Sequence, residues 1–200
     1  MIIRRRGRLS RLLFIPEDKK NLPYKASLSK NFCIFAALNR KDMTKATILS
    51  LEQTENAGLF TIIFEDENQS EFVRFVNKFK DDAVRKNDLR IILNQIDTML
   101  LKGFEERRFR PEGKMSDGVA ALPVYKSGLR LYCLRMSDSV LIVGNGGVKD
   151  TKTYEENEDL NGYVINLQKL DALLKADIKN GVVRIEKTEI IGTDDKEYDL

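Results

Sequence analysis

The stretch VAALPVYKSGLRLYCLRMSDSVLIVGNGG, residues 119–147, decides the fold. It contains three short apolar segments that are rich in β-branched or aromatic residues, namely 119–125, 129–135 and 140–143. The polar residues between them are typical of hairpin turns, and Pro123 marks the first segment as an edge or bulged strand. The stretch therefore predicts an antiparallel meander of three strands, closed by a tight turn at residues 144–147.

A strand and two helices precede this meander. Residues 59–64 are β-branched and aromatic, which predicts a strand. Apolar residues recur at helical spacing over 70–80, where Ser70 is a candidate N-cap, and over 88–102, which Gly103 ends. Because the turn between the helices is short and polar, we expect an antiparallel helical hairpin packed on a small, mainly antiparallel sheet. The order β-α-α-β-β-β predicts an α+β fold.

A helix and a strand are expected to extend this unit at its C-terminal end. Apolar residues at helical spacing between Leu167 and Ile178 predict the helix, with Asn166 as a candidate cap. Residues 182–191 predict a last strand. Residues 194–200 are acidic and predict a frayed tail.

Charge is divided unevenly along the chain. Residues 1–42 carry 11 Lys and Arg against 3 acidic residues, whereas residues 43–200 carry 23 against 28. The basic leader has three open interpretations: an over-called start before a natural beginning at Met43, an arm that binds nucleic acid, or a structural arm. The rest is expected to form one domain over 43–193. No stretch has the roughly 18 apolar residues of a membrane span, so we expect a cytoplasmic protein with no membrane partner.

The absence of histidine limits the chemistry. The 200 residues contain none, which excludes a Ser-His-Asp triad, a Cys-His nucleophile and any zinc site that needs His. Cys33 and Cys133 are too few for a disulfide framework or a four-thiolate site. Residues 140–147 look like the start of a dinucleotide-binding motif, but Lys149 stands where the third glycine belongs. We therefore expect no metal and no cofactor, and catalysis would use Asp, Glu, Lys, Arg, Tyr or Ser.

The middle strand of the meander carries the main candidate site. Side chains alternate across a strand, so its apolar residues would face the core while Arg130 and Tyr132 share an open face. Lys149, Lys152 and Tyr154 follow the neighbouring strand and would lie near them. The alternative interpretation is an ordinary amphipathic strand beside a solvated loop.

A second set of cations lies in the flanking loops, where Arg and Lys side chains could contact phosphate groups: Arg107, Arg108, Arg110, Lys114 and Lys126. Phe109, among them, could stack on a base. Neighbouring acidic residues cancel the formal charge, so a structural loop with Phe109 in the core is an equal alternative.

The order of elements and the sequence Gly128-Leu129-Arg130-Leu131-Tyr132 resemble the RelE/HigB-like toxin superfamily, the compact toxins of bacterial toxin–antitoxin pairs. The resemblance spans roughly residues 58–155 and includes the apolar strand that leads into Lys149, Lys152 and Tyr154. It implies a RelE-like fold and a metal-free, ribosome-dependent mRNA endoribonuclease, in which the ribose 2′-hydroxyl attacks the adjacent phosphate.

This resemblance also implies roles and partners. Arg130 would hold the scissile phosphate, Lys149 or Lys152 would supply a further positive charge or a leaving-group proton, and Tyr154 would orient or stack on the substrate. The implied partners are the ribosome with its mRNA and a small helix-turn-helix antitoxin. The added helix and strand would shield the sheet, or form a homodimer or antitoxin surface.

One departure from the family leaves the general base unassigned. RelE has lysines on the strand before the middle one, which serve as base and phosphate contact. Residues 119–124 of this chain contain no lysine, so Lys126, Lys114 or Arg110 would have to replace them. This departure and the acidic balance of residues 43–200 favour an alternative, a catalytically inactive RelE-fold module that binds a protein partner or nucleic acid.

Overall fold

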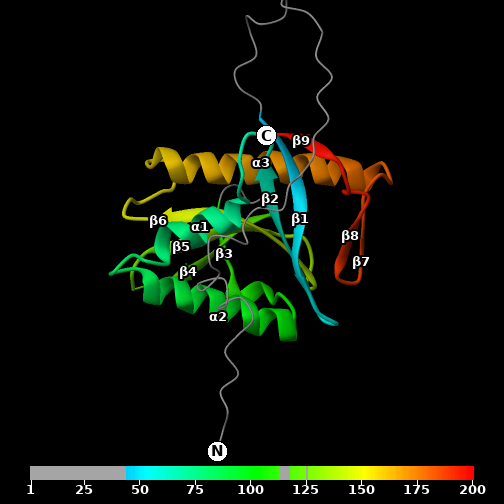
Figure 1. Cartoon of the computed structure of the whole chain (residues 1–200). Coiled ribbons are helices and arrows are strands. Elements are labelled where there is room, and N and C mark those ends of the chain that lie inside the picture. The colour runs from blue at the N-terminus through cyan, green and yellow to red at the C-terminus, as the bar shows by residue number, and fades with distance from the viewer. Residues whose placement is uncertain (1–43, 113–117, 125) are drawn as a thin grey trace, which may run out of the picture.

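The computed structural model describes residues 44–112, 118–124 and 126–200 of the chain. Within them the fold is α+β, with three α-helices and a mostly antiparallel mixed sheet (Figure 1). The leader 1–42 and Lys114 lie outside the described residues, and so do the interpretations placed on them.

Seven strands form the main sheet, in the order β3-β4-β5-β6-β2-β1-β9. Their bounds are β1 Lys45–Gln53, β2 Gly58–Phe64, β3 Arg110–Pro111, β4 Val119–Val124, β5 Leu129–Arg135, β6 Val140–Val148 and β9 Glu197–Asp199. Only the pair β2–β6 is parallel among these neighbours. The predicted meander is therefore present as β4-β5-β6.

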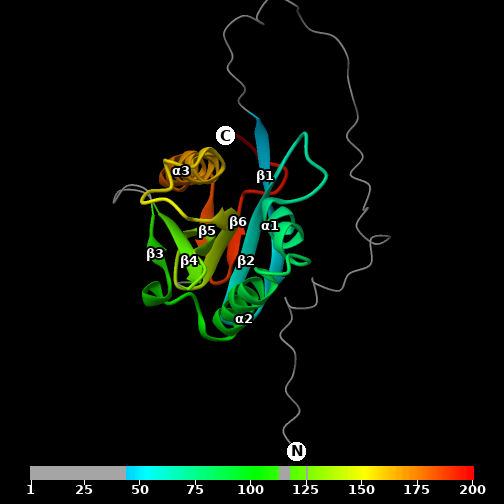
Figure 2. The same cartoon turned by 90° about the vertical axis from the view of Figure 1, so that its left-hand side faces the viewer.

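Helices cover both faces of this sheet. The hairpin of α1 (Glu71–Phe79) and α2 (Lys86–Lys102) packs on one face, and α3 (Glu158–Lys179) packs on the other (Figure 2). A short 3₁₀ helix, η3 (Glu106–Arg108), leads into β3, and β7 (Arg184–Glu186) and β8 (Glu189–Ile191) form a separate hairpin. The apolar residues form two cores, one on each side of the sheet.

Local sequence explains where the helices begin and end. The Ser70 hydroxyl accepts a hydrogen bond from the Val73 amide and caps α1. Gly103 ends α2 at φ 93°, a backbone conformation that favours glycine. Asn157, whose side chain accepts from the Leu160 amide, caps α3. The predicted cap at Asn166 is therefore wrong, because the helix extends back over the polar residues that precede it.

The predicted division of β5 between two faces is confirmed, but the predicted open face is wrong. Leu129, Leu131 and Cys133 pack in the core beneath α1 and α2. Tyr132 and Leu134 pack in the second core, beneath α3. The sheet therefore presents no open surface around Tyr132.

Three further predictions fail because backbone pairing, rather than local composition, defines these segments. Residues 144–147 continue β6 instead of forming a tight turn, since their backbone pairs with β5. The predicted strand over 182–191 is the β7–β8 hairpin. Residues 194–200 are not frayed, because β9 pairs with β1 and buries Tyr198 and Leu200.

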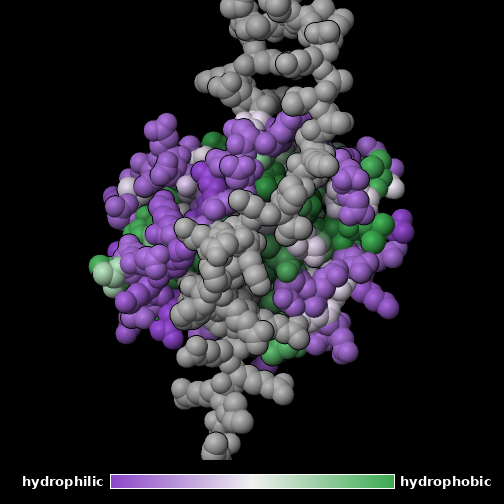
Figure 3. All heavy atoms as spheres, in the orientation of Figure 1, coloured by the Kyte–Doolittle hydropathy of each residue, from purple (hydrophilic) through white to green (hydrophobic). Residues whose placement is uncertain are grey.

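Burial in two cores leaves a mixed surface. On the face drawn in Figure 3, hydrophilic side chains predominate and apolar ones appear in small groups. In the part of the chain that the structure describes, no helix has the length and apolar character needed to cross a membrane.

Candidate functional site

Three cations surround one buried carboxylate, that of Glu112. Its side chain is 6% exposed, and Arg130 Nη1 donates a hydrogen bond to its Oε1. Arg110 Nε lies 3.7 Å from Oε1 and Lys149 Nζ lies 3.9 Å from Oε2. These four formal charges sum to a net positive site, in which the Arg130 and Lys149 side chains are only 11% and 7% exposed.

The sheet brings these residues together. Arg110 lies on β3, with Glu112 directly after it, and the Glu112 amide donates to the Val119 carbonyl at the start of β4. Arg130 lies on β5 opposite Gly147 of β6, and the Lys149 amide donates to the Gly128 carbonyl. Residues from three parts of the chain thus meet at one end of the meander.

Burial lowers the pKa of Lys149 below its ordinary value, and the positive charges of Arg130 and Arg110 act in the same direction. The carboxylate of Glu112 opposes this shift. Lys149 therefore gives up its proton more readily than a solvated lysine, which suits a proton donor.

Two tyrosines lie beside this cluster. Tyr132 is fully buried, and its hydroxyl has no hydrogen-bond partner within the described residues. Burial, with the Glu112 charge, raises the pKa of Tyr132 well above its ordinary value, so it stays protonated. Tyr154 is half-buried against the same core and close enough to act on Tyr132 electrostatically. The structure thus brings Arg130 and Lys149 together at Glu112, as the sequence suggested, but it places Tyr154 beside Tyr132 and puts Tyr132 in the core.

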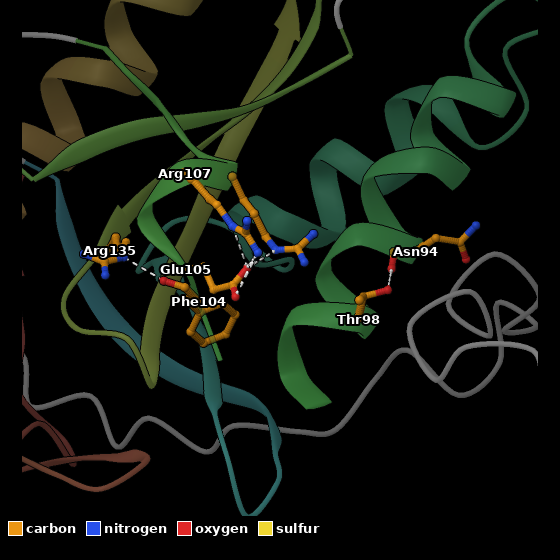
Figure 4. Close-up of polar contacts among 7 residues, drawn as sticks. Asn94, Thr98, Phe104, Glu105, Arg107 and Arg135 are labelled. Carbon is orange, nitrogen blue, oxygen red and sulfur yellow. Dashed lines mark hydrogen bonds and ion pairs between the residues drawn. The ribbon is translucent and has the colours of Figure 1, made fainter. Parts of the chain in front are cut away.

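The remaining predicted residues lie elsewhere. Lys152 is exposed in the loop between β6 and α3, and Lys126 is exposed in the turn between β4 and β5. Arg107 and Arg108 both pair with Glu105, at 3.1 and 3.0 Å (Figure 4). Of the loop cations that the structure describes, Arg110 is the one that forms an ion pair with Glu112.

A separate cleft of about 570 Å³ lies at the far end of β5, beside η3. Its lining includes Arg107, Arg135 and Asp138. Arg135 Nε donates to the Phe104 carbonyl at 2.7 Å (Figure 4), and its Nη2 pairs with Asp138. The two arginines of this cleft thus already have acidic or carbonyl partners.

Sequence reasoning missed the centre of the site, Glu112, and treated it only as a charge that cancels the arginines. One local signal was present: Arg110 and Glu112 are two residues apart in an extended segment, which places both side chains on the same side. Its partners Arg130 and Lys149 are distant in sequence, so their convergence could not be read from spacing.

Other reactive groups are less available. Cys133 is fully buried, its Sγ donates to the Ala120 carbonyl, and burial raises the pKa of its thiol. The thiol is therefore a poor nucleophile. Within residues 44–112, 118–124 and 126–200, no group of three Cys, Asp or Glu side chains could hold a metal ion.

A second buried carboxylate, Glu71, lies at the start of α1. It is 4% exposed, and Arg74 Nη1 donates to it at 3.0 Å beside the buried amide of Asn145 from β6. Burial raises the pKa of Glu71 despite these partners.

No family model, curated protein or solved structure matches this chain. The α+β class is shown by the helices and strands of the structure itself. The features of the chain that bear on its function are the chemistry of the Glu112 cluster and the order of its elements.

Proposed function

We propose that this protein is the toxin of a toxin–antitoxin pair and cleaves mRNA on the ribosome without a metal ion. The observation that carries the proposal is the convergence of Arg130 and Lys149 on Glu112. These residues supply two cations and one carboxylate in a site of low dielectric, where electrostatic interactions are strong.

The proposed reaction is an internal transesterification of RNA. The ribose 2′-oxygen forms a bond to the adjacent phosphorus, and the bond from phosphorus to the 5′-oxygen of the next nucleotide breaks. Glu112 accepts the 2′-hydroxyl proton, and Lys149 gives a proton to the departing 5′-oxygen. The products are a 2′,3′-cyclic phosphate and a 5′-hydroxyl, and no oxidant or co-reactant is needed.

Positive charge stabilises the transition state in this scheme. Arg130 holds the phosphate oxygens as negative charge accumulates on them, and Arg110, whose side chain is 49% exposed, contacts the incoming phosphate first. Tyr154 contacts or orients the substrate from the edge of the site. Glu112 thereby supplies the general base that the sequence left unassigned.

The order of elements gives independent support. From β2 to β6 the chain follows β-α-α-β-β-β, apart from the two-residue strand β3. This is the order on which the RelE/HigB-like resemblance rests. A small helix-turn-helix antitoxin that neutralises the toxin is part of the same proposal.

Induced expression with primer-extension mapping of transcripts tests the proposal. Wild-type protein should arrest growth and produce new mRNA ends within minutes. Arg130→Ala should lose about 100-fold or more of the cleavage, because one transition-state contact is removed. Glu112→Gln should lose a similar factor while keeping the shape of the side chain.

A matched arginine serves as the control. Arg184→Ala removes a 64% exposed guanidinium on the β7–β8 hairpin and should leave cleavage unchanged. Thermal unfolding of each purified variant shows whether it is folded. Undiminished growth arrest by folded Arg130→Ala and Glu112→Gln proteins would overturn the nuclease proposal.

A second candidate is a non-catalytic module of the same fold that binds a protein or nucleic acid. The observations that favour it are the ion pairs that Arg130 and Lys149 already make with Glu112 and the small exposure of these two side chains. If expression of the wild-type chain yields no new mRNA ends while the purified protein still binds a partner, this candidate replaces the first.

A further inference from the structure

The outward face of α3 carries apolar residues that nothing in the described chain covers. Ile165 and Leu173 are each 38% exposed, and Ala172 and Ala176 are exposed between and beyond them. Their spacing of three, four or seven residues places them on one side of the helix. The opposite side of α3 already packs on the sheet, through Leu160, Val164, Leu167, Leu170 and Leu174.

Gly162 lies next to this face, and no neighbour within the described chain requires a glycine at this position. A Cβ atom added there would meet nothing within 4 Å. In contrast, a Cβ at Gly144 or Gly147 would press on Leu167 or Leu160 of α3. Glycine inside a helix costs about 1 kcal/mol relative to alanine, and the open space at Gly162 leaves room for a second helix to approach closely.

The two ends of this face carry opposite charges, so the face complements a second copy of itself that runs in the opposite direction. Glu158 in the first turn and Lys179 in the last turn are exposed, and they lie about six turns apart on nearly the same side. A second α3 running antiparallel places each Glu158 opposite a Lys179, whereas a parallel one places like charges together. Antiparallel packing also brings opposite ends of the two helix dipoles together.

We propose that the protein forms a two-fold symmetric dimer through antiparallel pairing of α3 with α3 of a second copy. If the axis passes midway between Glu158 and Lys179, Ile165 of one copy lies opposite Ala172 of the other. Leu173 then projects toward the space at Gly162 of its partner helix. Lys169 lies close to the axis on the same face, so its charged end must extend past the partner helix to reach water.

The helix pair is a small interface, so the dimer should form in a concentration-dependent way. It leaves the Glu112 cluster outside the contact, because that cluster uses β3, β5 and the end of β6. The proposal therefore stands independently of the nuclease function.

Sedimentation equilibrium of the full chain over a wide concentration range tests the dimer. The mass should rise from 23.0 kDa toward twice that value. Ile165→Glu should weaken association at least 10-fold, since it buries a carboxylate of each copy against Ala172 of the other. Leu101→Glu, at a 67% exposed position on α2, should leave association unchanged.

Charge reversal tests the direction of pairing. Glu158→Lys should weaken association about 5-fold, and combining it with Lys179→Glu should restore the affinity, because each new pair is again of opposite sign. A mass that stays monomeric at all concentrations, or a dimer that tolerates Ile165→Glu, would overturn the proposal. Failure of the double reversal to restore affinity would overturn the antiparallel arrangement.

Discussion

Burial of Glu71 couples one carboxyl to the pH dependence of stability. Its pKa in the folded protein is raised above the ordinary value of 4.5, mainly because it is removed from water. The folded protein therefore holds this proton more tightly than the unfolded chain. That contribution to stability is complete below pH 4.5 and is lost as the pH rises through the raised pKa.

Glu71→Gln cannot ionise and so avoids this loss. Relative to the wild type, its unfolding temperature should rise from acid toward neutral pH and then stay level. Calorimetric scans of both proteins across that interval measure the difference. A difference that does not change with pH would show that burial of the Glu71 charge is not what limits stability.

Side-chain alternation is the residue-level feature that the sequence predicts best. The period of two in β5 places Leu131 on one side and Tyr132 on the other whatever lies above the sheet. It does not reveal which side is covered. Tyr132 was therefore expected to meet a substrate, although α3 buries it. Glu112 was missed for a related reason, since a carboxylate becomes a site only when distant cations fold around it.

At the scale of elements, the glycines of β6 allow close packing of neighbouring strands, although their composition suggests a turn. The run Gly144-Asn145-Gly146-Gly147 has the composition of a turn, yet it lies within a strand. A Cβ at Gly146 would lie 2.0 Å from the backbone carbonyl oxygen of Arg130, so glycine is needed there because the neighbouring strand comes too close for any side chain.

Gly146→Ala should therefore destabilise the protein by about 3 kcal/mol or more, because backbone rather than a flexible side chain must move. Gly144→Ala is the matched control on the same strand. Its Cβ would meet only the Leu167 side chain at 3.3 Å, so its cost should be much smaller. Urea unfolding of the two variants compares them, and equal midpoints would contradict the close approach at Gly146.

Most elements whose partners are near in sequence were predictable, with the β7–β8 hairpin as an exception, whereas the edge strand with a distant partner was not. The α1–α2 hairpin and the β4-β5-β6 meander follow from local periodicity and turn residues. The edge strand β9 pairs with β1, some 150 residues earlier in the chain, as in the pair Lys45 and Asp199. Three residues such as Glu197–Asp199 carry no strand signal of their own, so only the tertiary pairing defines them.

At the scale of the whole molecule, the sheet is buried on both faces, and this makes the C-terminal region part of the fold. The second core joins Tyr132, Leu134 and Ile142 of the sheet to Leu167 and Leu170 of α3. A compact unit that ended before α3 would expose the whole of this apolar face to water, which costs roughly 25 cal/mol for each Å².

A chain shortened by residues 158–200 should therefore fail to fold, although it keeps the predicted β-α-α-β-β-β unit. We expect loss of cooperative unfolding, binding of a hydrophobic dye and aggregation, since exposed apolar patches of this size promote association. Leu170→Ala in the full chain gives a graded version of the same test. It should cost about 2–5 kcal/mol because Leu170 is fully buried. A shortened chain that stayed monomeric and unfolded cooperatively would show that α3 is an accessory to the domain, and the second core would then contribute little to its stability.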